Sequence, residues 1–105
     1  MANGSVVTSG KFSGEEVEII IDFTSSLVGN ETLTGTPAIA VAVNSGIDVA
    51  PGDILNGAAS IDGNLVVVPV KGGIKNCSYL IKATCNTTNN DKILEMIAVL
   101  PINPQ

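Results

Sequence analysis

Few side chains in this sequence could carry out chemistry. The chain has no histidine, which excludes catalytic and metal sites built on an imidazole. Neighbouring acids remain, such as Asp48 with Asp53 and Glu15 with Glu16, and either pair could bind Ca²⁺ between loops. Neither has the spacing of a calcium-binding loop. The sequence therefore predicts a protein that is not an enzyme and that holds no metal or cofactor.

The two cysteines, Cys77 and Cys85, lie eight residues apart in a segment that alternates like a single strand. An extended strand would separate them by about 26 Å, whereas a disulfide needs α-carbons within about 7 Å. No basic residue stands beside Cys85 to activate it. We expect two reduced thiols in the core that behave as small apolar side chains.

The charge pattern argues against nucleic acid and membranes as partners. The net charge is minus five, with five scattered lysines and no arginine, whereas proteins that grip phosphates need a basic stripe. No apolar run approaches the ~20 residues of a spanning helix. Residues 1–14 lack the basic and apolar regions of a secretory signal. We therefore expect synthesis in the cytoplasm, and the Asn-X-Ser/Thr tripeptides at Asn30, Asn76 and Asn86 indicate turns rather than sugar.

The composition predicts one β-rich domain. Hydrophobic residues make up 45% of the 105 residues, but aromatics only 3%, so the core must consist of aliphatic side chains. Residues 65–70 are five aliphatics and Pro69, which predicts a buried strand. Pro69 places this strand at or near a sheet edge, or where the N–H at that position would point away from the sheet. Residues 77–85 alternate, with Tyr79 on the inner face. Gly72, Gly73 and Asn76 form the loop between them and tolerate a positive φ.

The rest of the chain is divided into further short strands. Residues 15–23 bury Val17, Ile19, Ile21 and Phe23, and residues 38–43 bury the β-branched side chains. Pro51 and Gly52 predict a type II turn, and Asp62-Gly63 a hairpin. A weaker strand is predicted at residues 54–61, and the last strand at residues 92–100, ended by Pro101 and Pro104. Such spacing predicts an all-β, antiparallel, immunoglobulin-like sandwich of six to seven strands over residues 15–105.

Residues 1–14 are expected to form an N-terminal arm. The arm offers Val6, Val7 and Phe12 as its apolar side chains, which is too little to order it alone. We predict that it packs on a neighbouring chain, with Val6 and Val7 at a strand edge and Phe12 in a pocket. The alternative is that the arm folds back along its own first or last strand. If it packs on a neighbour, deleting residues 1–13 should abolish assembly and change stability by less than about 0.5 kcal/mol.

Residues 16–100 resemble a family of small immunoglobulin-like proteins of tailed bacteriophages that are called fiber-tail adaptors. The residues that carry the resemblance are Asp22, Phe23, Leu27, Gly29, Val68, Pro69, Val70, Gly72, Gly73, Asn76, Tyr79, Asn89, Asn90, Lys92, Met96, Ala98 and Leu100. Phe23 stands where the family commonly has tryptophan, Pro69 replaces a second aromatic, Asn76 replaces a glycine, and Lys92 is the basic residue of the last hairpin.

The resemblance implies a virion structural protein, present in several copies, that joins tail or fiber components in particles assembled in the host cytoplasm. Its partners would be other tail, fiber or capsid proteins. A decoration protein of the phage head is one alternative, and a carbohydrate-binding or adhesive module is another. In sandwiches of this kind a tyrosine placed like Tyr79 often hydrogen-bonds a backbone group of the preceding loop, and we expect the same here.

Overall fold

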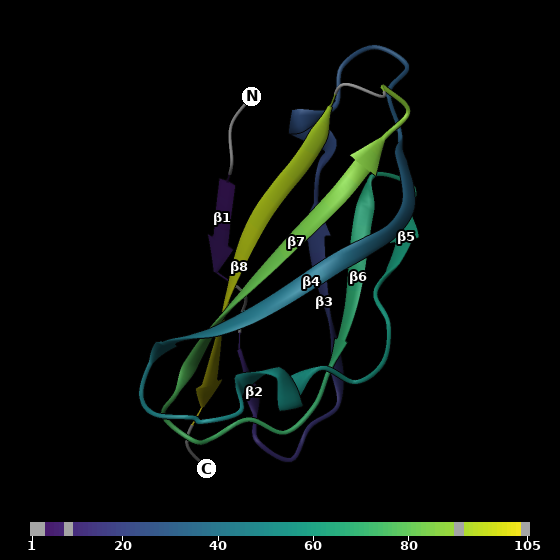
Figure 1. Ribbon diagram of the computed structural model, residues 1–105. Helices are drawn as coiled ribbons and strands as arrows, with labels where there is room; N and C mark the ends of the chain where they lie inside the picture. Colours follow the sequence, from purple (N-terminus) through teal and green to yellow (C-terminus); the bar gives the residue numbers. More distant parts are fainter. Residues whose placement is uncertain (1–3, 8–9, 90–91, 104–105) are drawn as a thin grey trace.

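The computed structural model describes residues 4–7, 10–89 and 92–103 and consists of two packed β-sheets (Figure 1). The five-stranded sheet has the order β1-β8-β7-β4, with β2 also paired to β8. The three-stranded sheet has the order β3-β6-β5. The strands are β1 (Gly4–Val7), β2 (Lys11–Phe12), β3 (Val17–Asp22), β4 (Leu33–Ser45), β5 (Ser60–Asp62), β6 (Leu65–Val70), β7 (Ser78–Thr87) and β8 (Ile93–Asn103).

The predicted all-β class is confirmed, but the sheets are mixed rather than purely antiparallel. Strands β3 to β8 pair antiparallel throughout. Both strands of the N-terminal arm, β1 and β2, run parallel to β8. Parallel neighbours cannot be joined by a short hairpin. The arm needs none, because the chain passes from it to β3 in the other sheet.

The core lies between the sheets and follows the predicted alternation. The inner side chains of β7 are all buried, and so are Ile19, Ile21 and Phe23 along and after β3. On the opposite face of β3, Ile20 is 47% exposed. The aliphatic side chains of β6 and β8 complete the core, which is what a chain with three aromatic residues requires. The buried side chains of β7 are Tyr79, Ile81, Ala83, Cys85 and Thr87.

Strand β6 has the predicted bounds and is the central strand of its sheet rather than an edge strand, so the second possibility for Pro69 holds. Pro69 is tolerated because its carbonyl accepts a hydrogen bond from Asn56 N at 2.9 Å. The amide nitrogen and carbonyl of one residue point to the same side of a strand. The nitrogen of Pro69 therefore faces the loop that holds Asn56, and the ladder with β3 loses no donor.

Pro101 does not end the last strand as predicted, because β8 continues to Asn103. The next residue, Ile102, donates its N–H to Cys77 O at 2.8 Å, so the nitrogen of Pro101 faces the arm. On that side β1 pairs only as far as Val99, and β2 begins opposite Ile102. Pro101 thus lies between the residues of β8 that pair with β1 and those that pair with β2. Pro104 lies outside the described residues.

The segment between β4 and β5 also differs from the prediction. Residues 51–54, Pro51–Ile54, form the 3-10 helix η2 rather than a type II turn, and the short extended piece expected at residues 47–49 is irregular. The strand predicted at residues 54–61 is reduced to Ser60–Asp62. Ile54 belongs to η2, and its side chain is buried in the core. A helical turn rather than a strand therefore brings this aliphatic side chain into the core. The hairpin at Asp62 is confirmed, because Asp62 pairs with Leu65.

Candidate functional site

The residues predicted to bind a partner all lie in the arm. Val6 and Val7 belong to β1 and stand opposite Ala98 and Val99 of the same chain, which is the alternative that the sequence left open. Phe12 lies in β2, and its side chain is 39% exposed. Contact of these residues with another chain stays a prediction, and Phe12 is the one whose exposed ring could meet a partner.

Lys11 fixes the arm to the sandwich, a role that its sequence position gave no sign of. Its side chain is only 2% exposed. The ammonium donates to three backbone carbonyls: Gly72 O at 2.5 Å, Phe12 O at 2.6 Å and Ser13 O at 3.4 Å. Burial lowers the pKa of Lys11, and the nearby carboxylate of Glu15 partly offsets this. The second half of the arm is therefore tied to the loop between β6 and β7.

The expected hydrogen bond of Tyr79 is confirmed. It is part of a set of hydrogen bonds that joins the loop of Ile74 to the loop of Asp48, which we call the Tyr79 pin. The hydroxyl accepts a hydrogen bond from Ile74 N at 3.0 Å and donates one to Asp48 Oδ2 at 2.7 Å. The other oxygen of Asp48 accepts from Ala50 N at 2.9 Å. Asn76, with φ 68°, is the one non-glycine residue with positive φ among the described residues, and it turns the chain into β7.

Removing the hydroxyl should loosen this pin. We expect Tyr79→Phe to lower the free energy of unfolding by about 1 kcal/mol, because Ile74 N and Asp48 each lose a partner. Urea unfolding measures the loss. An Asp48→Asn variant and the double variant complete a cycle that isolates the hydroxyl–carboxylate pair. A melting temperature of Tyr79→Phe equal to that of the native protein would contradict the prediction.

The same pair predicts how the phenol titrates. Burial, followed by the hydrogen bond to Asp48, raises the pKa of Tyr79 to about 12 from 10.0. A raised folded pKa means that the stabilisation is complete below pH 10 and is lost as pH rises through about 12. Since the chain has one tyrosine and no tryptophan, ultraviolet absorbance follows this titration alone.

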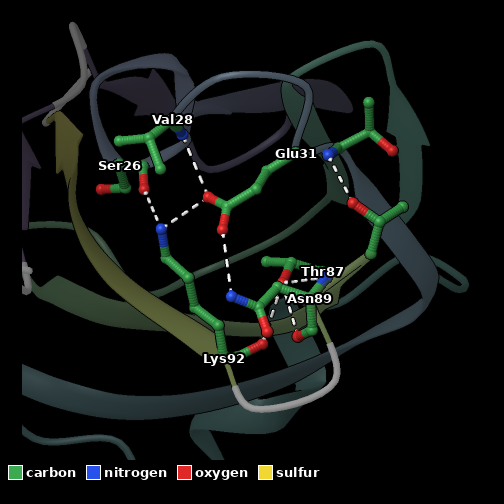
Figure 2. Close-up of polar contacts among 8 residues, drawn as sticks. Ser26, Val28, Glu31, Thr87, Asn89 and Lys92 are labelled. Carbon is green, nitrogen blue, oxygen red and sulfur yellow. Dashed lines mark hydrogen bonds and ion pairs between the residues drawn. The ribbon is translucent and has the colours of Figure 1, made fainter.

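At one end of the sandwich a polar cluster joins the loop before β4 to the hairpin between β7 and β8 (Figure 2). Lys92 Nζ donates to Glu31 Oε1 at 2.7 Å and to Ser26 O at 2.9 Å. Glu31 also accepts from Val28 N at 3.0 Å and from Asn89 Nδ2 at 3.3 Å. The side chains of Glu31 and Lys92 are 15% and 21% exposed. We call these five residues the loop clamp.

Beside the loop clamp is an open polar hollow of about 300 Å³, lined by Thr34, Asn86, Thr87, Asn89, Lys92 and Ile93. Its walls are hydroxyls, amides and a lysine whose ammonium is already bonded to Glu31. Such walls suit hydrogen bonding rather than proton transfer or nucleophilic attack. The arrangement can hold two loops in a fixed relation and can accept a polar group of a partner.

The loop clamp should make stability depend on pH in acid. The ammonium of Lys92, helped by Val28 N, lowers the pKa of Glu31 to about 2 from 4.5. A lowered folded pKa gives stabilisation that is complete above pH 4.5 and is lost as pH falls towards about 2. We expect the melting temperature to fall across this interval, and to fall less steeply in Glu31→Gln.

A matched control is available in the ion pair of Lys82 with Glu95, whose atoms are 3.9 Å apart and whose side chains are 46% and 41% exposed. Exposed pairs contribute little, so Glu95→Gln should leave the acid dependence of the melting temperature nearly unchanged. If Glu31→Gln and Glu95→Gln reduced the acid dependence of the melting temperature equally, the loop clamp would have no special role.

Two of the four acids considered as calcium ligands bind protein groups instead. Asp48 binds the Tyr79 hydroxyl, and Glu15 Oε1 accepts a hydrogen bond from Phe12 N at 2.8 Å. Among the described residues no three cysteine or carboxylate side chains gather in a way that could hold a metal ion. Cys77 and Cys85 are free and buried, as predicted, and burial raises the pKa of the Cys85 thiol. No helix in the described residues could cross a membrane.

Comparison with known protein families, with curated proteins and with solved structures finds no match to this chain.

Proposed function

We propose that this chain is a non-enzymatic structural protein of a tailed-bacteriophage virion, an accessory adaptor that links tail or fiber components through protein contacts. The observation that carries the proposal is the turn into β7, where Tyr79 bonds the backbone of Ile74 just after Gly72 and Gly73. These residues are among those on which the resemblance to the fiber-tail adaptors rests.

The order of the strands supports an immunoglobulin-like arrangement. In such folds the second, fourth and fifth strands of the seven form one sheet, and the third, sixth and seventh form the other. Here β3, β6 and β5 make one sheet and β4, β7 and β8 the other, with β1 beside β8. When β3 is matched to the second strand of that fold, every later strand falls in the expected sheet. The arm is the exception, because β1 and β2 pair with β8, whereas the first strand of that fold joins the sheet of the second, fourth and fifth strands.

The state of the polar groups supports a binding role over catalysis. Within the described residues every buried side-chain nitrogen or oxygen has a hydrogen-bond partner. The charged side chains that are buried or half-buried in this part of the chain, Lys11, Glu31, Asp48, Lys92 and Glu95, are all bonded to protein groups. In the parts of the chain that the structure describes, these groups leave no unpaired buried acid or base of the kind that general acid–base catalysis would use. The surfaces left for function are loops, strand edges and exposed aliphatic side chains.

A carbohydrate-binding module is the competing class, and the aromatic residues argue against it. Such modules usually stack sugars on exposed rings, yet Phe23 and Tyr79 are fully buried. Phe12 is the remaining aromatic residue. Binding to a glycan array that disappears in Phe12→Ala would favour this rival over the adaptor.

Quantification of the protein in purified particles tests the proposal. An adaptor that follows the rotational symmetry of a tail should be present in about a dozen copies or fewer. Mass spectrometry against the major capsid protein measures the ratio in particles of a phage that encodes the chain. Hundreds of copies would indicate a decoration protein of the head instead, and absence from the particles would refute a virion role.

A further inference from the structure

Strand β4 ends the five-stranded sheet with one side unpaired. It pairs with β7, and no other described strand joins its far side (Figure 1). A free strand edge presents backbone N–H and C=O groups in the spacing that another extended strand matches. The occupant that satisfies these groups is therefore a strand, and the question is which one.

Unlike the edge strands of the other sheet, β4 carries no charged side chain. Proteins commonly protect edges with charges, prolines or bulges. The edge strands of the other sheet follow this rule, since β3 contains Glu18 and Asp22 and β5 contains Asp62. In β4 a register shift between Thr34 and Ala38 interrupts the first part, but residues 38–43 pair with β7 in regular register. These six residues form an open and uncharged edge.

The side chains of residues 38–43 also suit a close neighbour. The alanines at 38, 40 and 42 are exposed, while Ile39, Val41 and Val43 are half-buried against the core. Next to the edge, the outer face of the sheet has a mostly apolar hollow of about 230 Å³. It is lined by Ala40, Val41, Ala42, Leu80, Lys82 and Ile97.

We propose that residues 38–42 pair antiparallel with the same residues of a second copy of this chain, about a twofold axis at Ala40. Residues 38–42 read Ala-Ile-Ala-Val-Ala and alternate alike in both directions. Ala40 then lies opposite its own counterpart and Ala38 opposite Ala42 on one face, while Ile39 lies opposite Val41 on the other. The two five-stranded sheets then join into one. This dimer does not depend on the proposed function.

The symmetric alternation of the segment favours a second copy as the occupant, and its lack of charge permits one. The chain has a net charge of minus five, so two copies repel each other wherever their carboxylates meet. A twofold contact places each residue near its own counterpart, and like charges directly opposite each other destabilise a sheet. Residues 38–43 avoid this penalty at a strand edge, because none of them is charged.

Two variants of opposite charge test the proposal. Sedimentation velocity over a range of concentrations should show the native protein forming dimers. Ala40→Lys and Ala40→Glu, each alone, should raise the dimer dissociation constant by about tenfold or more, because like charges then lie across the axis. An equimolar mixture of the two should form a heterodimer, since long side chains can pair directly or diagonally across strands.

Ser60→Lys is the matched control, because Ser60 is exposed on β5 at the edge of the other sheet. It should leave the dimer intact, and circular dichroism should show that all variants are folded. The proposal is overturned if the native protein stays monomeric at every concentration, which would leave the edge to a strand of another protein. It also fails if Ala40→Lys dimerises like the native protein, or if the mixture does not associate.

Discussion

Gly46→Ala should lower the free energy of unfolding by about 3 kcal/mol, the largest single-residue effect that we expect in this protein. Gly46 follows β4 with φ 90°, a conformation that side chains with a β-carbon rarely adopt. An added β-carbon would also collide with Cys77, whose Cα would be 3.1 Å away and whose Sγ would be nearer still. Because Cys77 is buried at the start of β7, it has little room to move. Urea unfolding measures the loss.

Gly57→Ala separates the two causes of this loss. Gly57 has a similar φ of 99°, but an added β-carbon would meet nothing within 4 Å. Its replacement should cost about 1 kcal/mol through backbone strain alone. The difference between the two variants then measures the collision with Cys77. Losses of equal size would show that the close approach of Gly46 to Cys77 does not contribute.

Lys11→Met should destabilise the protein by about 2 kcal/mol. Methionine can fill the buried space of the lysine stem, but it donates nothing to the carbonyls of Gly72 and Phe12. These oxygens would then be desolvated without their charged donor. Thermal and urea unfolding of the isolated protein report the loss.

Lys75→Met is the control, because Lys75 is exposed in the same loop region and should tolerate the change within about 0.5 kcal/mol. The comparison also bears on the arm. If the arm packs on a neighbouring chain in solution, Lys11→Met should leave the stability of the dilute protein unchanged. A loss at all protein concentrations indicates that the arm docks on its own chain, and deleting residues 1–13 should then destabilise the domain as well.

Elements whose signals are local could be predicted from the sequence. The six residues of β6 are aliphatic apart from Pro69 and lie between turn-forming residues, so their bounds were visible in the chain. The alternation of β7 and β3 assigned their inner faces correctly, because one buried face imposes period two. The bonding of Tyr79 to the preceding loop could be expected for the same reason, since Ile74 is five residues away.

Contacts between distant residues could not be predicted. Lys11 and Gly72 are separated by 61 positions, as are Glu31 and Lys92. A charged residue in a polar stretch is usually solvated, and no local pattern distinguishes Lys11 from the exposed Lys75. The effect of the prolines on the sheets could not be predicted for a related reason. Whether Pro69 and Pro101 interrupt a sheet depends on which side of the strand their nitrogen faces, and that is decided by the neighbouring strands.

The parallel pairing of β1 with β8 decides how the molecule carries mechanical load. Gly4 lies beside Met96, whereas β8 runs on to Asn103. The chain therefore enters β1 at one end of the sheet and leaves β8 at the other. Tension between these ends draws β1 and β8 past each other along their length. Their hydrogen bonds then resist together in shear instead of opening one at a time. The tension acts directly on β1 and β8, so the pairing between the arm and β8 is loaded before the core. The rate at which this pairing opens then sets the resistance to forced unfolding.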